Sequence, residues 1–418
     1  MMKRYAKGTL AAVGVSALLV GCSGGASGSG QQDGVTTLTF SMWAGSDAEN
    51  EALKTLVALV EEENPDIRLE LETAPFNDYW TKLAAQASGG SEACILGVQS
   101  PRTTSIQGLL RPLDDASLEA AGIDLAEFDP SIVEATSVGG EQMAVPYDLG
   151  PLIVFYNADA FTAAGLDAPA ADWTVEDFTA AAAALSGDGS YGYAINPSLD
   201  TTTAWSLTLA GDQGVAEDGT LQMDSPAMVE AVEFLQGLVA EGSSPQLPAT
   251  SDSYNALNSF VAGDSAMAVD GPWQLAYVAE QVGFEFGVAT IPAGPDGTST
   301  PVAGSGYGVS ASCAYPEEAL RAIATLTGPE AQTALAEMGR AYPARVAEQP
   351  SYFHGEFEVA EETLSSAGES GQPLRSTANF TQVNTLFNQY AVSALNGDLS
   401  ASDFLATVQT QTEAGAKQ

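Results

Sequence analysis

The beginning of the chain carries two alternating patterns with a helical pattern between them. Residues 37–42 and 67–72 alternate between polar and apolar side chains, which is the period of a half-buried strand. Between them, apolar residues at positions 53, 56, 57 and 60 follow the spacing of one helix face, with Ser46 or Asp47 as the cap and Asn64-Pro65 as the stop. Strand, helix and strand within about 35 residues predict a βαβ unit, and therefore a parallel sheet with a right-handed crossover.

Similar patterns continue along the chain and predict an α/β fold. Thr174 and Asp177 form a capping box at the start of one expected helix, and Ser225 caps another that begins with Pro226. The expected strands cover residues 94–98, 142–147, 267–269, 286–291 and 307–311, and the expected helices cover residues 174–185, 226–240, 253–262 and 316–326.

Aromatic and polar residues stand where the expected strands end. Ligands of open parallel sheets bind beyond the carboxyl ends of the strands. Trp43 follows the first strand, Phe76 follows the second, and Gln99 and Ser100 close the third. No GxGxxG follows either of the first two strands, so a dinucleotide site of the usual kind is disfavoured.

Length and charge narrow the class of protein further. The chain has 418 residues, more than one hydrophobic core usually holds, so two lobes are expected. It carries 54 acidic against 13 basic residues, a net charge of −41. Such a surface repels phosphate backbones, so nucleic acid is excluded as a partner. A strongly anionic ligand is disfavoured unless a local basic pocket overrides the charge.

The first residues have the composition of an export signal. Lys3, Arg4 and Lys7 precede an apolar run over residues 10–20, about half the length that a membrane-spanning helix needs. The tetrad Leu19-Val20-Gly21-Cys22 resembles a bacterial lipoprotein signal, which implies cleavage of residues 1–21 and a diacylglycerol on the Cys22 sulfur. A plain secretory signal is the alternative. Residues 22–34 are rich in Ser and Gly and are expected to form a flexible tether.

The cysteine and histidine counts limit the chemistry of any site. With Cys22 assigned to lipid, Cys94 and Cys313 remain, and a disulfide between them is plausible in an oxidising compartment. His354 is the single histidine, so a histidine-built zinc site is not expected. We expect neither a metal nor a cofactor.

A set of short motifs, in their order and spacing, resembles a known family. The motifs are residues 38–43 (LTFSMW), 109–114 (LLRPLD), 145–148 (VPYD), 155–157 (FYN), 173–178 (WTVEDF), 260–264 (FVAGD), 270–273 (DGPW) and 329–332 (PEAQ). Over nearly the whole mature chain, the sequence resembles the extracellular solute-binding proteins of carbohydrate-importing ABC transporters, the family of maltose-binding protein.

The resemblance implies a fold of the periplasmic-binding-protein kind. Two α/β lobes, each with a mainly parallel sheet flanked by helices, would enclose a ligand cleft. The chain would cross between them near residues 148–151, near residues 292–296 and after Pro343. Lobe 1 would then comprise residues 35–148 and 296–345, and lobe 2 residues 149–295 and 346–418.

The resemblance also suggests which residues bind a ligand. A sugar has flat C–H faces that stack on aromatic rings and hydroxyls that pair with carboxylates and amides. Trp43, Trp205 and Trp273 are the stacking candidates, against the alternative that such rings belong to the core. Asp148 and Asp270, at strand ends, are the polar candidates, although each carboxylate could instead orient a turn.

Further candidates share the same edges of the expected sheets. They are Phe76, Gln99, Ser100, Tyr147, Gly304, Ser305, Tyr307 and Arg345. Phe76 could equally pack beneath the next helix. The glycine-rich run 304–308 would let backbone approach a ligand or a neighbouring strand, whereas a phosphate cradle is disfavoured because no GxxxxGK[ST] is present. Arg345 is either a cleft residue or an interlobe ion pair, and Arg102 is a weaker candidate of that kind.

One departure from the family pattern bears on the thiols. Residues 93–95 are Ala-Cys-Ile where the family commonly has a Pro-Asp pair. In a family-like sheet this strand start lies beside the end of the returning strand, where Cys313 stands. The resemblance therefore favours a Cys94–Cys313 disulfide over two buried free thiols.

The predicted function is solute capture, without catalysis. The chain would be a monomeric, lipid-anchored binding protein on the outer face of the cell membrane that delivers a sugar or oligosaccharide to its ABC permease. A glycoside hydrolase is disfavoured because spacing singles out no carboxylate pair, and GxSxG, HExxH and a Ser/His/Asp set are all missing as convincing constellations. A sensing or adhesive lipoprotein stays open, as does a non-sugar solute such as a polyol or glycerol phosphate.

Overall fold

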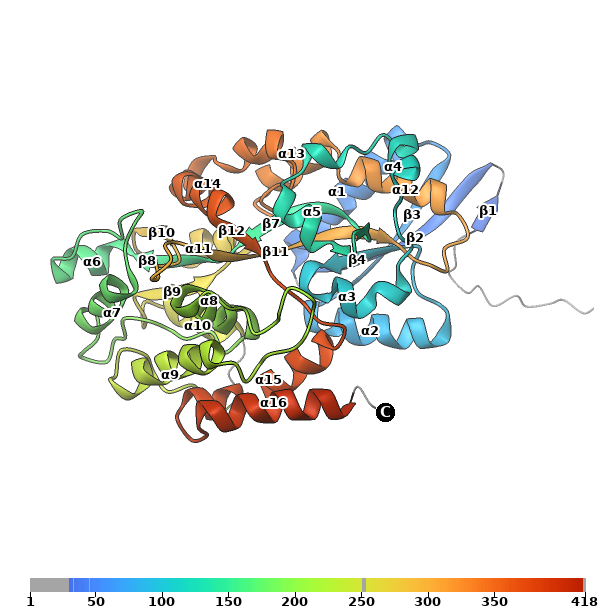
Figure 1. Cartoon of the computed structure of the whole chain (residues 1–418). Coiled ribbons are helices and arrows are strands. Elements are labelled where there is room, and N and C mark those ends of the chain that lie inside the picture. The colour runs from blue at the N-terminus through green and yellow to red at the C-terminus, as the bar shows by residue number, and fades with distance from the viewer. Residues whose placement is uncertain (1–29, 33, 45, 250–252, 416–418) are drawn as a thin grey trace, which may run out of the picture.

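The computed structural model describes residues 30–32, 34–44, 46–249 and 253–415, arranged as two lobes around two sheets (Figure 1). The predicted signal and the predicted lipidation residue Cys22 lie outside the described residues, whereas residues 30–32 of the predicted flexible tether form a short strand. Among the helices of the described ranges, none is long and apolar enough to cross a membrane.

The larger sheet, in lobe 1, has seven strands. They are β1 (Gly30–Gln32), β2 (Val35–Trp43), β3 (Ile67–Ala74), β4 (Ile95–Gln99), β7 (Val145–Pro151), β11 (Thr300–Val309) and β12 (Gly371–Pro373). Strand β2 lies parallel to both β3 and β4, so the predicted βαβ unit is confirmed. Strand β11 runs antiparallel to β4 and β7, which makes the sheet mixed.

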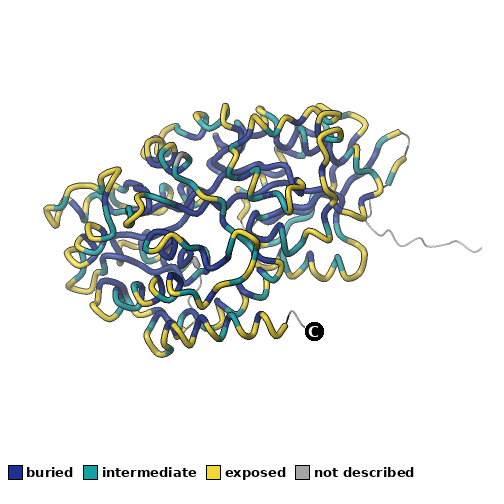
Figure 2. Tube along the Cα trace, viewed as in Figure 1, coloured by how far each residue is buried: buried dark blue, intermediate teal, exposed yellow. Residues whose placement is uncertain are grey.

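Helices cover both faces of this sheet (Figures 1 and 2). They are α1 (Asp47–Glu63), α2 (Phe76–Gly89), α3 (Thr103–Ile106), α4 (Asp115–Ala121), α5 (Pro130–Ala135), α12 (Pro316–Leu326) and α13 (Pro329–Glu337), with the one-turn helices η1 (Ser100–Arg102), η2 (Gln107–Leu109) and η3 (Leu125–Glu127) and the short pair β5 (Ser137–Val138) and β6 (Glu141–Gln142). Ser46 caps α1 in a capping box with Glu49, which explains why α1 begins at Asp47.

The smaller sheet, in lobe 2, corrects one expectation. Strands β8 (Ile153–Asn157), β9 (Met267–Asp270) and β10 (Phe286–Thr290) form it in the order β10-β8-β9, and both pairings are antiparallel. The prediction of a mainly parallel sheet is therefore wrong for lobe 2. Only Leu152 separates β7 from β8, so β8 continues out of lobe 1 in the direction of β7. Strands β9 and β10, which flank β8, run antiparallel to it.

Helices also surround the sheet of lobe 2. They are α6 (Ala158–Ala164), α7 (Val175–Ala184), α8 (Leu199–Ala210), α9 (Pro226–Ala240), α10 (Ser253–Val261), α11 (Leu275–Gln281), α14 (Glu361–Ser370), α15 (Phe380–Leu395) and α16 (Ala401–Gly415), with η4 (Pro272–Gln274), η5 (Val346–Tyr352) and η6 (Gly355–Ala360). The predicted capping box of α7, Thr174 with Asp177, is confirmed. Helix α8 was not predicted, because it is buried along most of its length and so shows no amphipathic stripe.

Two hydrophobic cores divide at the small sheet. Ile153 and Phe155 of β8 belong to the core that also fills lobe 1, whereas Val154 belongs to a second core beneath α8, α9, α15 and α16. Alternate residues of one strand thus face different cores, as the period of two requires. The two-lobe α/β fold is confirmed, while the residue limits given above for each lobe stay a prediction.

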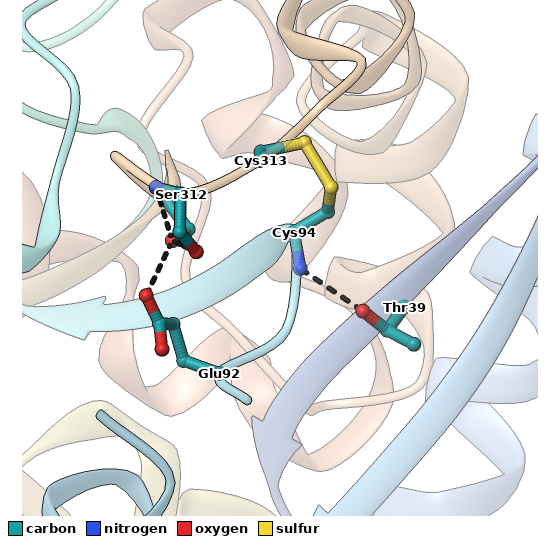
Figure 3. Close-up of a disulfide and its surroundings, with 6 residues drawn as sticks. Thr39, Glu92, Cys94, Ser312 and Cys313 are labelled. Carbon is teal, nitrogen blue, oxygen red and sulfur yellow. Dashed lines mark hydrogen bonds between the residues drawn. A yellow bond between two sulfur atoms is a disulfide. The ribbon is translucent and has the colours of Figure 1, made fainter. Parts of the chain in front are cut away.

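A disulfide joins Cys94 to Cys313, with an S–S distance of 2.02 Å (Figure 3). The Cys94 N–H donates to Thr39 Oγ1 at 3.0 Å, and the Cys94 carbonyl accepts from the Ser310 N–H at 2.9 Å. These contacts set the start of β4 beside the segment that follows β11. The predicted pairing of the two cysteines is therefore present in the structure.

Candidate functional site

The candidate site lies where the strands of lobe 1 end against lobe 2. Strands β2 and β4 run parallel, so Trp43 and Gln99 stand at the same edge of the sheet. Asp148 of β7 pairs with Ser305 of β11, and Ser305 in turn pairs with Gln99. The long strand β11 runs from the lobe 2 side of the molecule into lobe 1 (Figure 1).

An aromatic cluster forms the β2 side of this edge. The Trp43 ring lies 5.5 Å from Phe76, 5.4 Å from Tyr79 and 5.6 Å from Trp80, measured between centroids. Trp43 is buried, so its ring packs within this cluster. Trp80, which the sequence analysis did not select, lies 4.5 Å beneath the guanidinium of Arg102.

Arg102 connects lobe 1 to lobe 2. Its Nε donates to Gln99 Oε1 at 3.0 Å, and its guanidinium lies 5.5 Å from the ring of Phe380 on α15. Burial lowers the pKa of Arg102 to about 10, opposed by the nearby Asp200 carboxylate on α8. Burial raises the pKa of Asp200, and Arg102 counteracts that shift. Arg102 and Asp200 therefore attract each other electrostatically across the two lobes. Asp200 was missed because it stands in the unpredicted helix α8.

The serine and glycine candidates support the strands here. Ser100 Oγ accepts from the Gly304 N–H at 3.2 Å. A Cβ added at Gly304 would lie 2.6 Å from the Asp148 carbonyl oxygen and 2.6 Å from a methyl carbon of Ile132. Gly304 is therefore required because β7 and α5 pack closely on β11. Of the two roles that the sequence analysis left open for this glycine, approach to a ligand or to a neighbouring strand, the structure shows the second.

Asp270 and Trp273 form the lobe 2 side of the site. Asp270 ends β9, and its Oδ1 accepts from the Gly271 N–H at 2.8 Å. Burial raises the pKa of Asp270 to about 7, against the hydrogen bonds of Gly271 and Trp273 and with the help of the Asp200 charge. Trp273 is 37% exposed, and its ring lies so close to Gly150 that a Cβ there would come within 2.5 Å of it. The ring thus packs against the chain crossing at Gly150.

Asp148 lies on the lobe 1 side with two tyrosines and an arginine. Burial raises the pKa of Asp148 to about 6, although Arg340 and Ser305 oppose the shift. The rings of Tyr147 and Tyr307 stack at 4.8 Å with an interplanar angle of 14°. Arg340 was missed by the sequence analysis, since it follows α13 in a short loop with no motif of its own.

Two of the predicted ligand residues have other roles. Trp205 is fully buried in the core of lobe 2 against Phe178 and Phe234, and its Nε1 donates to Tyr193 Oη at 3.4 Å, so neither ring face is left for a sugar. The predicted stacking role of Trp205 is wrong.

The guanidinium of Arg345 bonds to Glu127 at 2.8 Å and to Glu348 at 3.2 Å. It also lies 5.1 Å from the ring of Phe128. Arg345 is therefore an ion-pair residue beside η3, which agrees with the ion-pair alternative of the sequence analysis and not with the cleft alternative. No three Asp, Glu, Cys or His side chains of the described ranges gather as a metal site would require.

The fold and this meeting of two polar, aromatic surfaces define a two-lobe binding protein. The family model of the bacterial extracellular solute-binding proteins matches residues 55–353. The chain therefore belongs to the bacterial extracellular solute-binding protein family. This is a family of binding proteins, in agreement with the prediction that the chain is not an enzyme.

Curated relatives match part of the chain. A putative binding protein of Brucella abortus (strain 2308) is 26% identical over 245 residues, which cover 57% of this chain and 58% of the relative. The sn-glycerol-3-phosphate-binding periplasmic protein of Escherichia coli (strain K12) is 26% identical over 289 residues, 65% of this chain and 64% of the relative. The chain thus matches less than two thirds of the length of each.

Solved structures share the fold over nearly the whole chain. An ABC substrate-binding protein of Listeria monocytogenes in complex with cycloalternan is 22% identical, with a TM-score of 0.81 over 91% of this chain and 99% of its own. The maltose-bound MalE3 protein of T. maritima is 22% identical, with a TM-score of 0.76 over 90% of this chain and 99% of its own.

Proposed function

We propose that this chain is the extracellular substrate-binding component of an ABC importer and captures a sugar or oligosaccharide between its two lobes. The observation that carries the proposal is the proximity of Asp270 to the exposed ring of Trp273 on lobe 2, together with Asp148 on lobe 1. An aromatic ring and carboxylates match the two kinds of surface that a sugar presents.

Similar folds in named sugar complexes support this reading. The cycloalternan and maltose complexes share the two-lobe fold. Within the proposal, residues 35–148 and 296–345 form lobe 1 and residues 149–295 and 346–418 form lobe 2. The ligand would stabilise a closed arrangement of the lobes that docks on the permease. Cys22 would carry the lipid that holds the monomer on the outer face of the membrane.

A second candidate solute is a glycerol phosphate. The relative of Escherichia coli that is named for sn-glycerol 3-phosphate supports it. The acidic net charge of −41 opposes it, since a phosphate ester must approach a negative surface.

Thermal unfolding with a ligand panel tests the proposal. Cycloalternan, maltose, maltotetraose, acarbose, tagatose and sn-glycerol 3-phosphate would each be added to the mature protein. A solute at one hundred times its Kd stabilises the folded state by about 2.7 kcal/mol, which raises the Tm by several degrees. We expect at least one saccharide to do so.

A tryptophan variant locates the binding. Trp273→Ala should remove most of the shift, because it deletes the exposed ring. Tyr277→Ala is the matched control, since Tyr277 is also 37% exposed and stands one helical turn further along, on α11. Equal saccharide affinity of Trp273→Ala and the wild type would show that the proposed site is wrong.

A further inference from the structure

Five buried polar atoms from four neighbouring residues complete no hydrogen bond. They are Tyr147 Oη, Asp148 Oδ1, Tyr307 Oη, and Nε and Nη2 of Arg340. Buried polar groups in native proteins are nearly always paired, so a group of unpaired atoms calls for a partner. Asp148 and the two tyrosines are each more than nine-tenths buried, and the Arg340 side chain is 9% exposed.

The four residues converge from three elements. Tyr147 and Asp148 belong to β7 and Tyr307 to β11, and Arg340 follows α13, which Gln332 ties to the Tyr147 carbonyl at 2.6 Å. Arg340 interacts electrostatically with both tyrosines and with Asp148. The preceding Gly339 has a φ of +66°, which turns the chain after α13.

The fold holds these side chains in place without satisfying them. The Tyr147 and Tyr307 rings stack, and Phe40 meets Tyr307 edge-on at 5.3 Å. Ser305 interacts with both Tyr147 and Asp148, and Tyr147 interacts with Asp148, but these contacts leave Tyr147 Oη and Asp148 Oδ1 without a hydrogen bond of ordinary geometry. Glu49 Oε1 is 3.6 Å from Arg340 Nε, beyond hydrogen-bonding distance. The unpaired atoms are therefore preorganised donors and acceptors.

Charge decides which ligand fits. Arg340 already faces the carboxylates of Asp148 and Glu49, and Arg102 faces Asp200. The positive charge of each guanidinium is already balanced by these carboxylates. Asp270 adds a further carboxyl group to the site. A phosphate ester would place its negative charges beside these carboxylates, whereas a pair of hydroxyls can accept from the arginine fork and donate to Asp148.

We propose that Arg340, Asp148, Tyr147 and Tyr307 form a polar subsite on lobe 1 that binds a neutral, hydroxyl-rich end of the ligand and discriminates against phosphate esters. This subsite rests on the proposed function, because it names the chemistry that one end of the same interlobe site recognises.

Calorimetric titration of Arg340→Gln tests the subsite. The probes are the saccharide that binds the wild type best and sn-glycerol 3-phosphate. Loss of charged hydrogen bonds to the ligand should weaken saccharide binding about 10- to 100-fold. Arg321→Gln, which removes an exposed arginine paired with Asp66 in lobe 1, is the matched control and should bind as the wild type does.

A double variant guards against misfolding. Arg340→Gln leaves Asp148 buried without its cation, so Arg340→Gln/Asp148→Asn is measured beside it. Wild-type affinity for the saccharide in both variants would overturn the subsite and leave the proposed function standing. Tighter binding of sn-glycerol 3-phosphate than of any saccharide would overturn the preference for neutral ligands. A folded wild type that binds no saccharide would contradict the proposed function and the subsite together.

Discussion

Asp270 is a buried carboxyl group whose pKa links the stability of the protein to pH. Its carboxylate is buried at the end of β9 and has one backbone donor, the Gly271 N–H. Burial raises its pKa from the ordinary range of an aspartate to about 7. The folded protein therefore binds a proton at Asp270 more tightly than the unfolded chain does, and the stability from this group is lost as the pH rises from about 4 through 7.

Asp270→Asn should flatten that dependence. The amide cannot ionise, so the variant should lose less stability than the wild type between pH 5 and pH 8, by at most about 3 kcal/mol. Denaturant unfolding of the ligand-free protein at a series of pH values measures it. Asp167→Asn, at an exposed carboxylate, is the control and should keep the wild-type profile. An Asp270→Asn profile parallel to the wild type would contradict the burial argument.

Single residues were the least predictable part of the site. Asp270 and Trp273 could be placed at the lobe interface because they follow a strand with a recognisable motif. Trp205 could not be told from a ligand-stacking ring, since its burial depends on contacts with Phe178 and Phe234, which come from distant segments. Arg340 had no sequence signal, because the residues that it interacts with stand on the distant segments β7, β11 and α1.

At the scale of elements, the sequence predicted those helices, strands and caps that are determined by interactions between residues close in the chain. The strands and helix of the first βαβ unit, with Ser46 as one of its two candidate caps, and the capping box of α7 follow from short-range patterns. The antiparallel order of β8, β9 and β10 did not, because strand pairing depends on how distant segments meet. The return strand β11 begins at Thr300, earlier than the expected start at residue 307, since its first half pairs with β7 and β12.

The disulfide is an element-scale constraint within lobe 1. It joins the start of β4 to the segment after β11, across a sequence separation of 219 residues. Replacing both Cys94 and Cys313 by Ala should lower the free energy of unfolding by about 2–5 kcal/mol, because the unfolded chain gains freedom. Denaturant unfolding measures this loss.

Ligand affinity gives the internal control for that experiment. Both cysteines lie away from the strand ends that face lobe 2, so the double variant should bind the saccharide as the wild type does. Labelling of both thiols in denatured, unreduced wild-type protein would show that the bond is absent in solution.

At the scale of the whole molecule, two lobes meet at surfaces of matched chemistry. Lobe 1 contributes Arg102, Asp148 and Arg340, and lobe 2 contributes Asp200, Asp270 and Trp273. In this strongly acidic chain, Arg102 and Arg340 each lie near a carboxylate here. The arrangement suits a neutral solute held between lobes whose relative position the solute controls.

The crystal structure of the mature protein with its bound saccharide tests the central claim most directly. The account predicts saccharide density between the lobes, with a ring face on Trp273 and hydroxyls within hydrogen-bonding distance of Asp270, Asp148 and Arg340. Saccharide density on an outer face of either lobe, with no contact to Trp273 or Asp270, would contradict it.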